Sequence, residues 1–182
     1  MPKGLATVAG SRIVDRVAAA LRAETDSLLL VANDPGADAW LAGVPRIADR
    51  EPGLGPLAGI HAALIHAGTS VLVVAWDMPF VTRPLLAELR CRGESAGIAV
   101  VPESAPGQIE PTCALYTQAS TPVMGRWLGS GRSGAAAFLS GCAGVDRIAA
   151  ADVGRFGDPA RLFFSINTPA ALEQAEALAA LF

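Results

Sequence analysis

An aspartate at the end of an apolar run is the first candidate for chemistry in this chain. The run Val71–Asp77 is apolar until its last residue, and Met78 and Pro79 follow it. A continuous aliphatic run of this length predicts a strand buried on both faces, as in a parallel sheet. Open parallel sheets bind ligands at the carboxyl ends of their strands. Asp77 therefore suits a metal or a phosphate-bearing ligand, although an Asx turn or a helix cap would also explain it.

Two more polar residues follow predicted strands. Asn33 comes after the apolar run 27–32, and Asp49 comes after a weaker run at 44–48. Either residue alone is an ordinary turn former. Because the carboxyl ends of parallel strands meet at one edge of a sheet, we expect Asn33, Asp49 and Asp77 to face one crevice. Three such residues in series favour a ligand site.

Three loop segments offer further candidates, each with an ordinary explanation beside the functional one. Gly55 precedes a helix predicted at 56–67, where it either lets backbone N–H groups approach a ligand or simply joins a loop to a helix. Arg132 and Ser133 lie in a glycine-rich loop that suits an anion or a turn with a capping serine. Asn167 lies just before the last predicted helix, where a plain helix start also fits.

The remaining reactive side chains form no site by their spacing. His61 and His66 are five positions apart on one predicted helix, so they point in different directions and do not form a metal pair. The three cysteines are widely spaced and odd in number, which argues against a disulfide framework and favours buried thiols. Cys113 has no partner at a spacing typical of nucleophilic catalysis.

Helical and strand patterns alternate along most of the chain. The alternation predicts an α/β fold with a doubly wound, mostly parallel sheet, helices on both faces, and a single domain over residues 1–182. A flexible excursion is expected at 102–108. Helices are expected at 11–23 capped by Ser11, 37–41, 56–67, 83–90 capped by Thr82, 119–128, 134–139 and 169–181, and strands at 27–32, 44–48, 71–77, 98–101, 109–116 and 161–166.

Composition limits the partners. A chain with 52% hydrophobic and only 17% charged residues is typical of a globular domain with a large core. The net charge is −3 and the basic residues are dispersed, so we expect no nucleic-acid partner. No apolar stretch reaches the roughly 18 residues of a membrane span, and no signal-peptide core follows the N-terminus. We therefore expect a cytoplasmic protein with no membrane partner.

Four segments together resemble a known family. Gly55–Ile60, Val73–Phe80, Ile109–Tyr116 and Ser165–Pro169 occur in the order seen in molybdenum cofactor guanylyltransferases, and the resemblance runs from about Lys3 to the C-terminus. The Gly-Pro-Leu-Ala-Gly helix start and the Asp-Met-Pro strand end are its strongest parts. They favour guanylyltransferases over the related cytidylyltransferases. The resemblance implies a fold like that of nucleotide-diphospho-sugar transferases.

The resemblance also implies an activity. The reaction is a Mg²⁺-dependent nucleotidyl transfer of GMP from GTP to the phosphate of molybdopterin cofactor, with release of pyrophosphate. Such a phosphate is already ionised at neutral pH and needs no general base. Catalysis then requires that two anions be brought together and that charge on the α-phosphate be spread. Mg²⁺ and a lysine are suited to both tasks. The implied residues are Asp77 as metal ligand and catalytic residue, Lys3 as catalytic and nucleotide-binding residue, Asn33, Asp49 and Gly55 as further nucleotide contacts, and Asn167, Arg132 and Ser133 as substrate contacts.

The sequence departs from the family pattern at its start. The family begins with an apolar strand and a glycine-rich loop that carries an arginine and wraps the nucleotide phosphates, whereas this sequence begins after both. We therefore expect an N-terminally incomplete domain with an empty place between the strands at 27–32 and 71–77, and two unpaired strand edges. Weak or absent GTP turnover is expected of the chain as it stands. A start-site error, a deliberate truncation and a degenerate protein each explain the departure.

Two other functions remain open at this point. One is transfer of CMP or another nucleotide to the same or a different phosphorylated acceptor. The other is a non-catalytic protein that binds molybdopterin or a partner enzyme. GTP and molybdopterin cofactor are the expected small-molecule partners, with molybdoenzymes or their chaperones as protein partners. Both a monomer and a homo-oligomer are compatible with the sequence.

Overall fold

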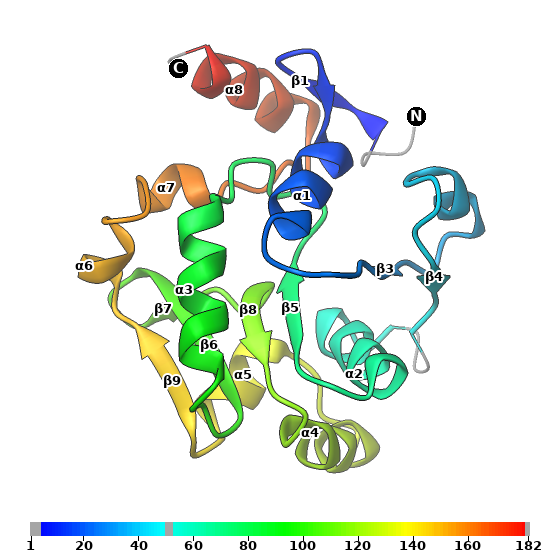
Figure 1. Cartoon of the computed structure of the whole chain (residues 1–182), viewed down its shortest axis with the longest axis vertical. Helices are drawn as coiled ribbons and strands as arrows, with labels where there is room; N and C mark the ends of the chain where they lie inside the picture. The colour runs from blue at the N-terminus through cyan, green and yellow to red at the C-terminus, as the bar shows by residue number, and fades with distance from the viewer. Residues whose placement is uncertain (1–4, 50–52, 181–182) are drawn as a thin grey trace.

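A computed structural model describes residues 5–49 and 53–180 (Figure 1). Its helices and strands alternate as expected. None of the described helices is long and apolar enough to cross a membrane. In chain order the elements are β1 Thr7–Val8, β2 Ser11–Arg12, α1 Ile13–Arg22, β3 Leu30–Val31, the 3₁₀ helix η2 Pro35–Ala39, β4 Arg46–Ile47, α2 Pro56–Ala67, β5 Val71–Val74, α3 Arg83–Gly93, β6 Ala99–Ala105, β7 Gln108–Ile109, β8 Cys113–Tyr116, α4 Ser120–Gly129, α5 Ala135–Ser140, β9 Val145–Ile148, α6 Ala150–Val153, α7 Pro159–Leu162 and α8 Pro169–Ala179.

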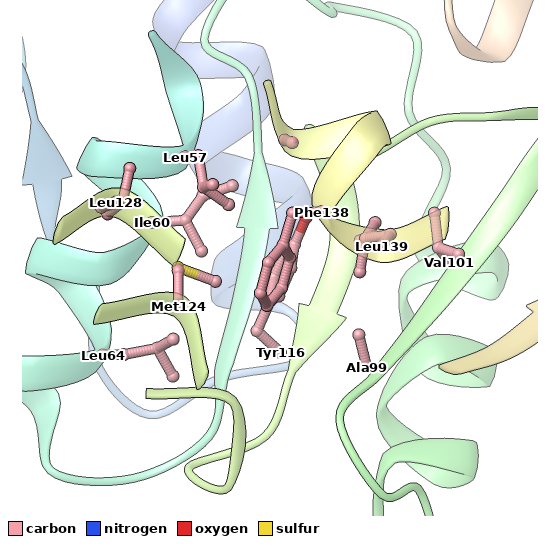
Figure 2. Packing of buried hydrophobic residues seen from close by; sticks show 12 residues of the cluster. Leu57, Ile60, Leu64, Ala99, Val101, Tyr116, Met124, Leu128, Phe138 and Leu139 are labelled. Carbon is pink, nitrogen blue, oxygen red and sulfur yellow. The ribbon is translucent and has the colours of Figure 1, made fainter. Parts of the chain in front are cut away.

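The main sheet has the doubly wound arrangement expected from the sequence. β8 pairs antiparallel with both β5 and β6, and β6 pairs parallel with β9, so β5, β6 and β9 run in one direction. Along β8, Ala114 and Tyr116 pack with α2, α4 and α5, whereas Cys113 and Leu115 pack with α3. This alternation follows from the two-residue period of a strand, and it places helices on both faces (Figure 1). Figure 2 shows the first face, where Tyr116 and Phe138 lie among side chains from all three helices.

The sheet is interrupted beside β5. β3 and β4 pair parallel in a two-stranded sheet of their own, and among the described residues β3 makes no ladder with β5. A cavity of about 1220 Å³ lies against both strands and follows β5 along its whole length. Among the described residues, β3 and β5 are therefore separate strands that border one cavity. The expectation that the strand at 71–77 is buried on both faces is wrong, because all four β5 residues are only half-buried beside this cavity.

Other expected elements differ in the structure, among them the single strand at 109–116, which is divided into β7 and β8. The apolar segment 161–166 is not a strand, because Asp158 caps α7 by accepting a hydrogen bond from the Ala160 N–H. The last strand is instead β9, a short segment with an Asp-Arg centre that the sequence pattern did not reveal. The segment 102–108 is no flexible excursion, since β6 continues to Ala105 and turns at Gly107 into β7.

Thr82 occupies the N-cap position of α3 as expected and Ser11 does not occupy that of α1, but neither side chain makes a capping bond. Ser11 belongs to β2, and Arg12 occupies the N-cap of α1 without a side-chain capping bond. The Thr82 hydroxyl donates to the Phe156 carbonyl instead of capping α3. Both residues have the right type for a cap, but each is used by a neighbouring part of the fold.

Glu24 ties α1 to α3. Its side chain is only 4% exposed and accepts hydrogen bonds from Arg83 Nε at 2.7 Å and from Arg90 Nε at 3.4 Å. The two arginines lie at opposite ends of α3. Their hydrogen bonds, led by that of Arg83, hold the pKa of Glu24 below its ordinary value of 4.5.

We predict that Glu24→Gln lowers stability in a pH-dependent way. A carboxylate with a lowered folded-state pKa stabilises the fold above its ordinary pKa, and this contribution is lost as the pH falls through the lowered value. Urea unfolding should therefore show a deficit in the variant at pH 6 to 7 that shrinks as the pH approaches 3. A deficit of equal size at both pH values would mean that the charge of Glu24 does not stabilise the fold.

Candidate functional site

The cavity beside β5 brings together the strand-end residues singled out in the sequence. Asn33 follows β3, Asp49 follows β4 and Asp77 follows β5, and all three line this cavity. Gly55, at the start of α2, lines it as well. The expected common crevice is therefore present. These three polar residues lie past the carboxyl ends of their strands, which is where open α/β sheets bind ligands.

Asn33 and Asp49 form a reciprocal pair that connects the ends of β3 and β4. Asn33 Nδ2 donates to Asp49 Oδ2 at 2.8 Å, and the Asp49 backbone N–H donates to Asn33 Oδ1 at 3.0 Å. These two bonds fix both side chains. The other carboxylate oxygen of Asp49, Oδ1, is buried and has no hydrogen-bond partner among the described residues. A buried acceptor without a partner indicates a place for a donor from a ligand or water.

Asp77 is held from the far end of the chain. Its backbone carbonyl accepts from the Ile166 N–H at 3.0 Å, and its Oδ2 accepts from the Ser165 hydroxyl at 2.7 Å. Asn167 Nδ2 donates to the same hydroxyl oxygen at 2.7 Å. Asn167 therefore reaches Asp77 through Ser165. Ser165 lines the cavity, and sequence reasoning missed it as an individual residue. The sequence signal that could have found Ser165 is its spacing of two residues from Asn167, because residues two apart in an extended segment lie on the same side.

Gly55 gives α2 its starting direction. It adopts φ 74° and ψ −165°, a conformation that residues other than glycine rarely adopt. A Cβ placed there would meet nothing within 4 Å, so the backbone angle, not space, requires glycine. The α2 N-terminus lines this side of the cavity with Pro56 and Gly59, and the positive end of the helix dipole favours negative charge there.

The described wall of the cavity is acidic. Asp34, Asp49 and Asp77 line it, and no lysine or arginine is among the described residues that do so. No group of three or more His, Cys, Asp or Glu side chains in the described residues could hold a metal by itself. Mg²⁺ commonly binds through one or two carboxylates together with substrate phosphates, so Asp77 fits a cation that arrives with a nucleotide.

Of the other predicted residues, one falls outside the described part of the chain and two do not line the cavity. Lys3 is outside the described residues. Arg132 and Ser133 do not line the cavity, and the Arg132 guanidinium lies 3.3 Å from the centre of the Trp127 ring. Their roles toward a substrate stay predictions. Complete burial raises the pKa of the Cys113 thiol to about 12, which agrees with the expectation that it is no nucleophile.

Comparison with known proteins is consistent across sequence and structure. Residues 1–149 match the family described as a MobA-like NTP transferase domain. The molybdenum cofactor guanylyltransferase of Nitrobacter hamburgensis is 35% identical over 196 residues, covering 98% of this chain and 87% of that protein. The enzyme of the same name from Sinorhizobium fredii is 32% identical, covering 96% and 83%.

Two solved structures of nucleotidyltransferase type are similar to this chain along nearly its whole length. The molybdopterin-guanine dinucleotide biosynthesis protein A of Archaeoglobus fulgidus has a TM-score of 0.83 and 28% identity, covering 100% of this chain and 92% of that one. The 2-C-methyl-D-erythritol 4-phosphate cytidylyltransferase of Thermus thermophilus has a TM-score of 0.73 and 25% identity, covering 98% and 94%. The expected resemblance of the fold to nucleotidyltransferases of this type is confirmed.

We predict that Gly55→Ala destabilises the protein by about 1–3 kcal/mol, because alanine, unlike glycine, is strained at the positive φ of this position. Urea unfolding measures this free energy. Gly129→Ala is the matched control, since its Cβ also meets nothing within 4 Å and its φ is not left-handed. The control should be neutral or gain up to ~1 kcal/mol. Equal tolerance of both substitutions would show that the observed angle at Gly55 does not persist in solution.

Proposed function

Because this chain belongs to the MobA-like NTP transferase family, we propose that it transfers GMP from GTP to molybdopterin cofactor, giving the guanine dinucleotide form of the cofactor and pyrophosphate. One observation carries the proposal. The polar residues that follow three separate strands, Asn33, Asp49 and Asp77, line a single cavity large enough for a nucleotide and a second substrate. The curated relatives above carry this activity in their names.

Asp49 is suited to select the base. Its Oδ1 is buried and has no hydrogen-bond partner among the described residues, while Oδ2 accepts from Asn33. Guanine presents two neighbouring donors, the N1–H and the 2-amino group, on one edge. Cytosine presents its amino donor beside an acceptor nitrogen. A carboxylate can only accept, so it pairs better with guanine. This supports GTP over CTP as the nucleotide.

The charge of the site calls for a cation with the nucleotide. A triphosphate facing Asp34, Asp49 and Asp77 would be repelled unless positive charge accompanied it. We propose that Asp77 holds a Mg²⁺ ion, which would offset charge on the phosphates when bound. Lys3 and the α2 N-terminus behind Gly55 would add further attraction for the phosphates.

The acceptor phosphate needs no general base, because it is ionised at neutral pH. The protein's own contribution is then to orient two anions and to stabilise charge on the α-phosphate. Asn167, Arg132 and Ser133 are proposed as contacts to the molybdopterin substrate. The reaction would take place in the cytoplasm, with molybdoenzymes or their chaperones receiving the product.

We predict that Asp49→Asn weakens GTP binding by about 10–100-fold, the value of a hydrogen bond to a charged group. Asn33 Nδ2 would keep the new amide oxygen in the place of Oδ2, which would turn the amide NH₂ toward the donors of guanine. Calorimetric titration of Mg²⁺ with GTP and with CTP measures both affinities. The wild type should prefer GTP, and CTP binding should change less than GTP binding in the variant.

Asp34→Asn is the matched control for that experiment. It removes the same charge from the same cavity, but the Asp34 carboxylate accepts from the Gly36 N–H and not from Asn33. Its effect on GTP should be small and equal for CTP. Equal losses of GTP affinity in both variants would show that Asp49 acts through charge alone, and tighter binding of CTP by the wild type would overturn the guanylyl assignment.

A further inference from the structure

Residues 165–167 are fixed against the end of β5 by backbone and packing. The Ile166 N–H donates to the Asp77 carbonyl at 3.0 Å, and the Ile166 side chain is 4% exposed in a cluster with Ile13 and Phe80. The residues on either side of Ile166 therefore point away from that cluster. Ser165 and Asn167 are thereby placed on the side of Asp77.

The chemistry of the groups determines how the hydroxyl proton is used. A carboxylate only accepts, and a serine hydroxyl has a single proton to donate. The 2.7 Å contact between Ser165 Oγ and Asp77 Oδ2 therefore uses this proton. The oxygen of Ser165 is then left to accept from the Asn167 amide at 2.7 Å. The three side chains form one directed series, from Asn167 through Ser165 to Asp77.

This series leaves the two carboxylate oxygens of Asp77 in different situations. Oδ2 is engaged by Ser165, and Oδ1 receives no hydrogen bond from the described residues. The terminal torsion of an aspartate is soft, so an isolated carboxylate would rotate broadly. One fixed oxygen removes this freedom and leaves the other as the ligand for a cation.

We propose that Ser165 is a positioning residue, which orients Asp77 so that Oδ1 is presented to the metal of a bound metal–nucleotide complex. The inference rests on the proposed function. Asn167 supports this arrangement by directing the Ser165 proton to Asp77, in addition to any contact with substrate. Partners that orient a metal ligand commonly contribute 10–100-fold to metal affinity, about the size expected here.

The test measures binding of Mn²⁺·GTP by the electron paramagnetic resonance signal of protein-bound manganese. Ser165→Ala should weaken binding by about 10–100-fold, and Ser165→Thr should restore it because threonine keeps the hydroxyl. Ser95→Ala serves as the matched control, since Ser95 is exposed and bonds only the Arg92 carbonyl. The control should bind like the wild type, and thermal unfolding should show that each variant is folded.

A double-mutant cycle with Asp77→Asn separates positioning from a general structural role. If Ser165 acts through Asp77, Ser165→Ala should have no further effect once Asp77 is changed. Equal weakening in both backgrounds would overturn the inference, as would normal Mn²⁺·GTP binding by Ser165→Ala. Failure of the wild type to bind Mn²⁺·GTP would instead overturn the proposed function, and the inference with it.

Discussion

The site depends on how the end of β5 is held. Among the described residues, β5 has a ladder partner on one edge, where Val71–Val74 pair with β8, and its four residues line the cavity. An ordinary central strand is held on both sides. Here the second restraint comes from the segment 165–167, which bonds both the backbone and the side chain of Asp77 across 88 positions of sequence. The position of Asp77 therefore depends on two separate parts of the chain.

The other wall of the cavity is held by β3 and β4. β3 and β4 carry Asn33 and Asp49 on their own small sheet, and the reciprocal bonds between these side chains keep the two strand ends together. The described wall carries Asp34, Asp49 and Asp77, which is why we propose that a nucleotide binds there together with a cation. In the proposed function, Asp49 contacts the base and Asp77 holds the cation, so two different carboxylates would recognise the nucleotide and offset its charge.

The sequence predicted well wherever a local signal marks a boundary. Pro56 and Gly68 delimit α2 as expected, because proline suits the first helical position and Gly68 adopts the left-handed angle at the end. The strand ends at Asn33, Asp49 and Asp77 were likewise visible, since polar residues stop apolar runs. Their presence in one cavity followed from the parallel-sheet rule.

Expectations were wrong where distant contacts decide. The segment 161–166 is apolar because it packs on the core, but a capping aspartate before it starts a helical turn. β9 is polar at its centre and is a strand because β6 offers it an edge. The half-burial of β5 and the bond from Ser165 to Asp77 depend on elements that a local pattern does not contain.

The central claim is that Asp77 serves catalysis of guanylyl transfer. The most direct test is the cofactor content of cells whose own copy of the gene carries Asp77→Ala, with the exposed Asp152→Ala as control and protein levels matched by immunoblot. We predict that the guanine dinucleotide form disappears and unmodified molybdopterin cofactor accumulates only in the Asp77 variant. Normal guanine dinucleotide in those cells would contradict it and would favour a non-catalytic binding protein.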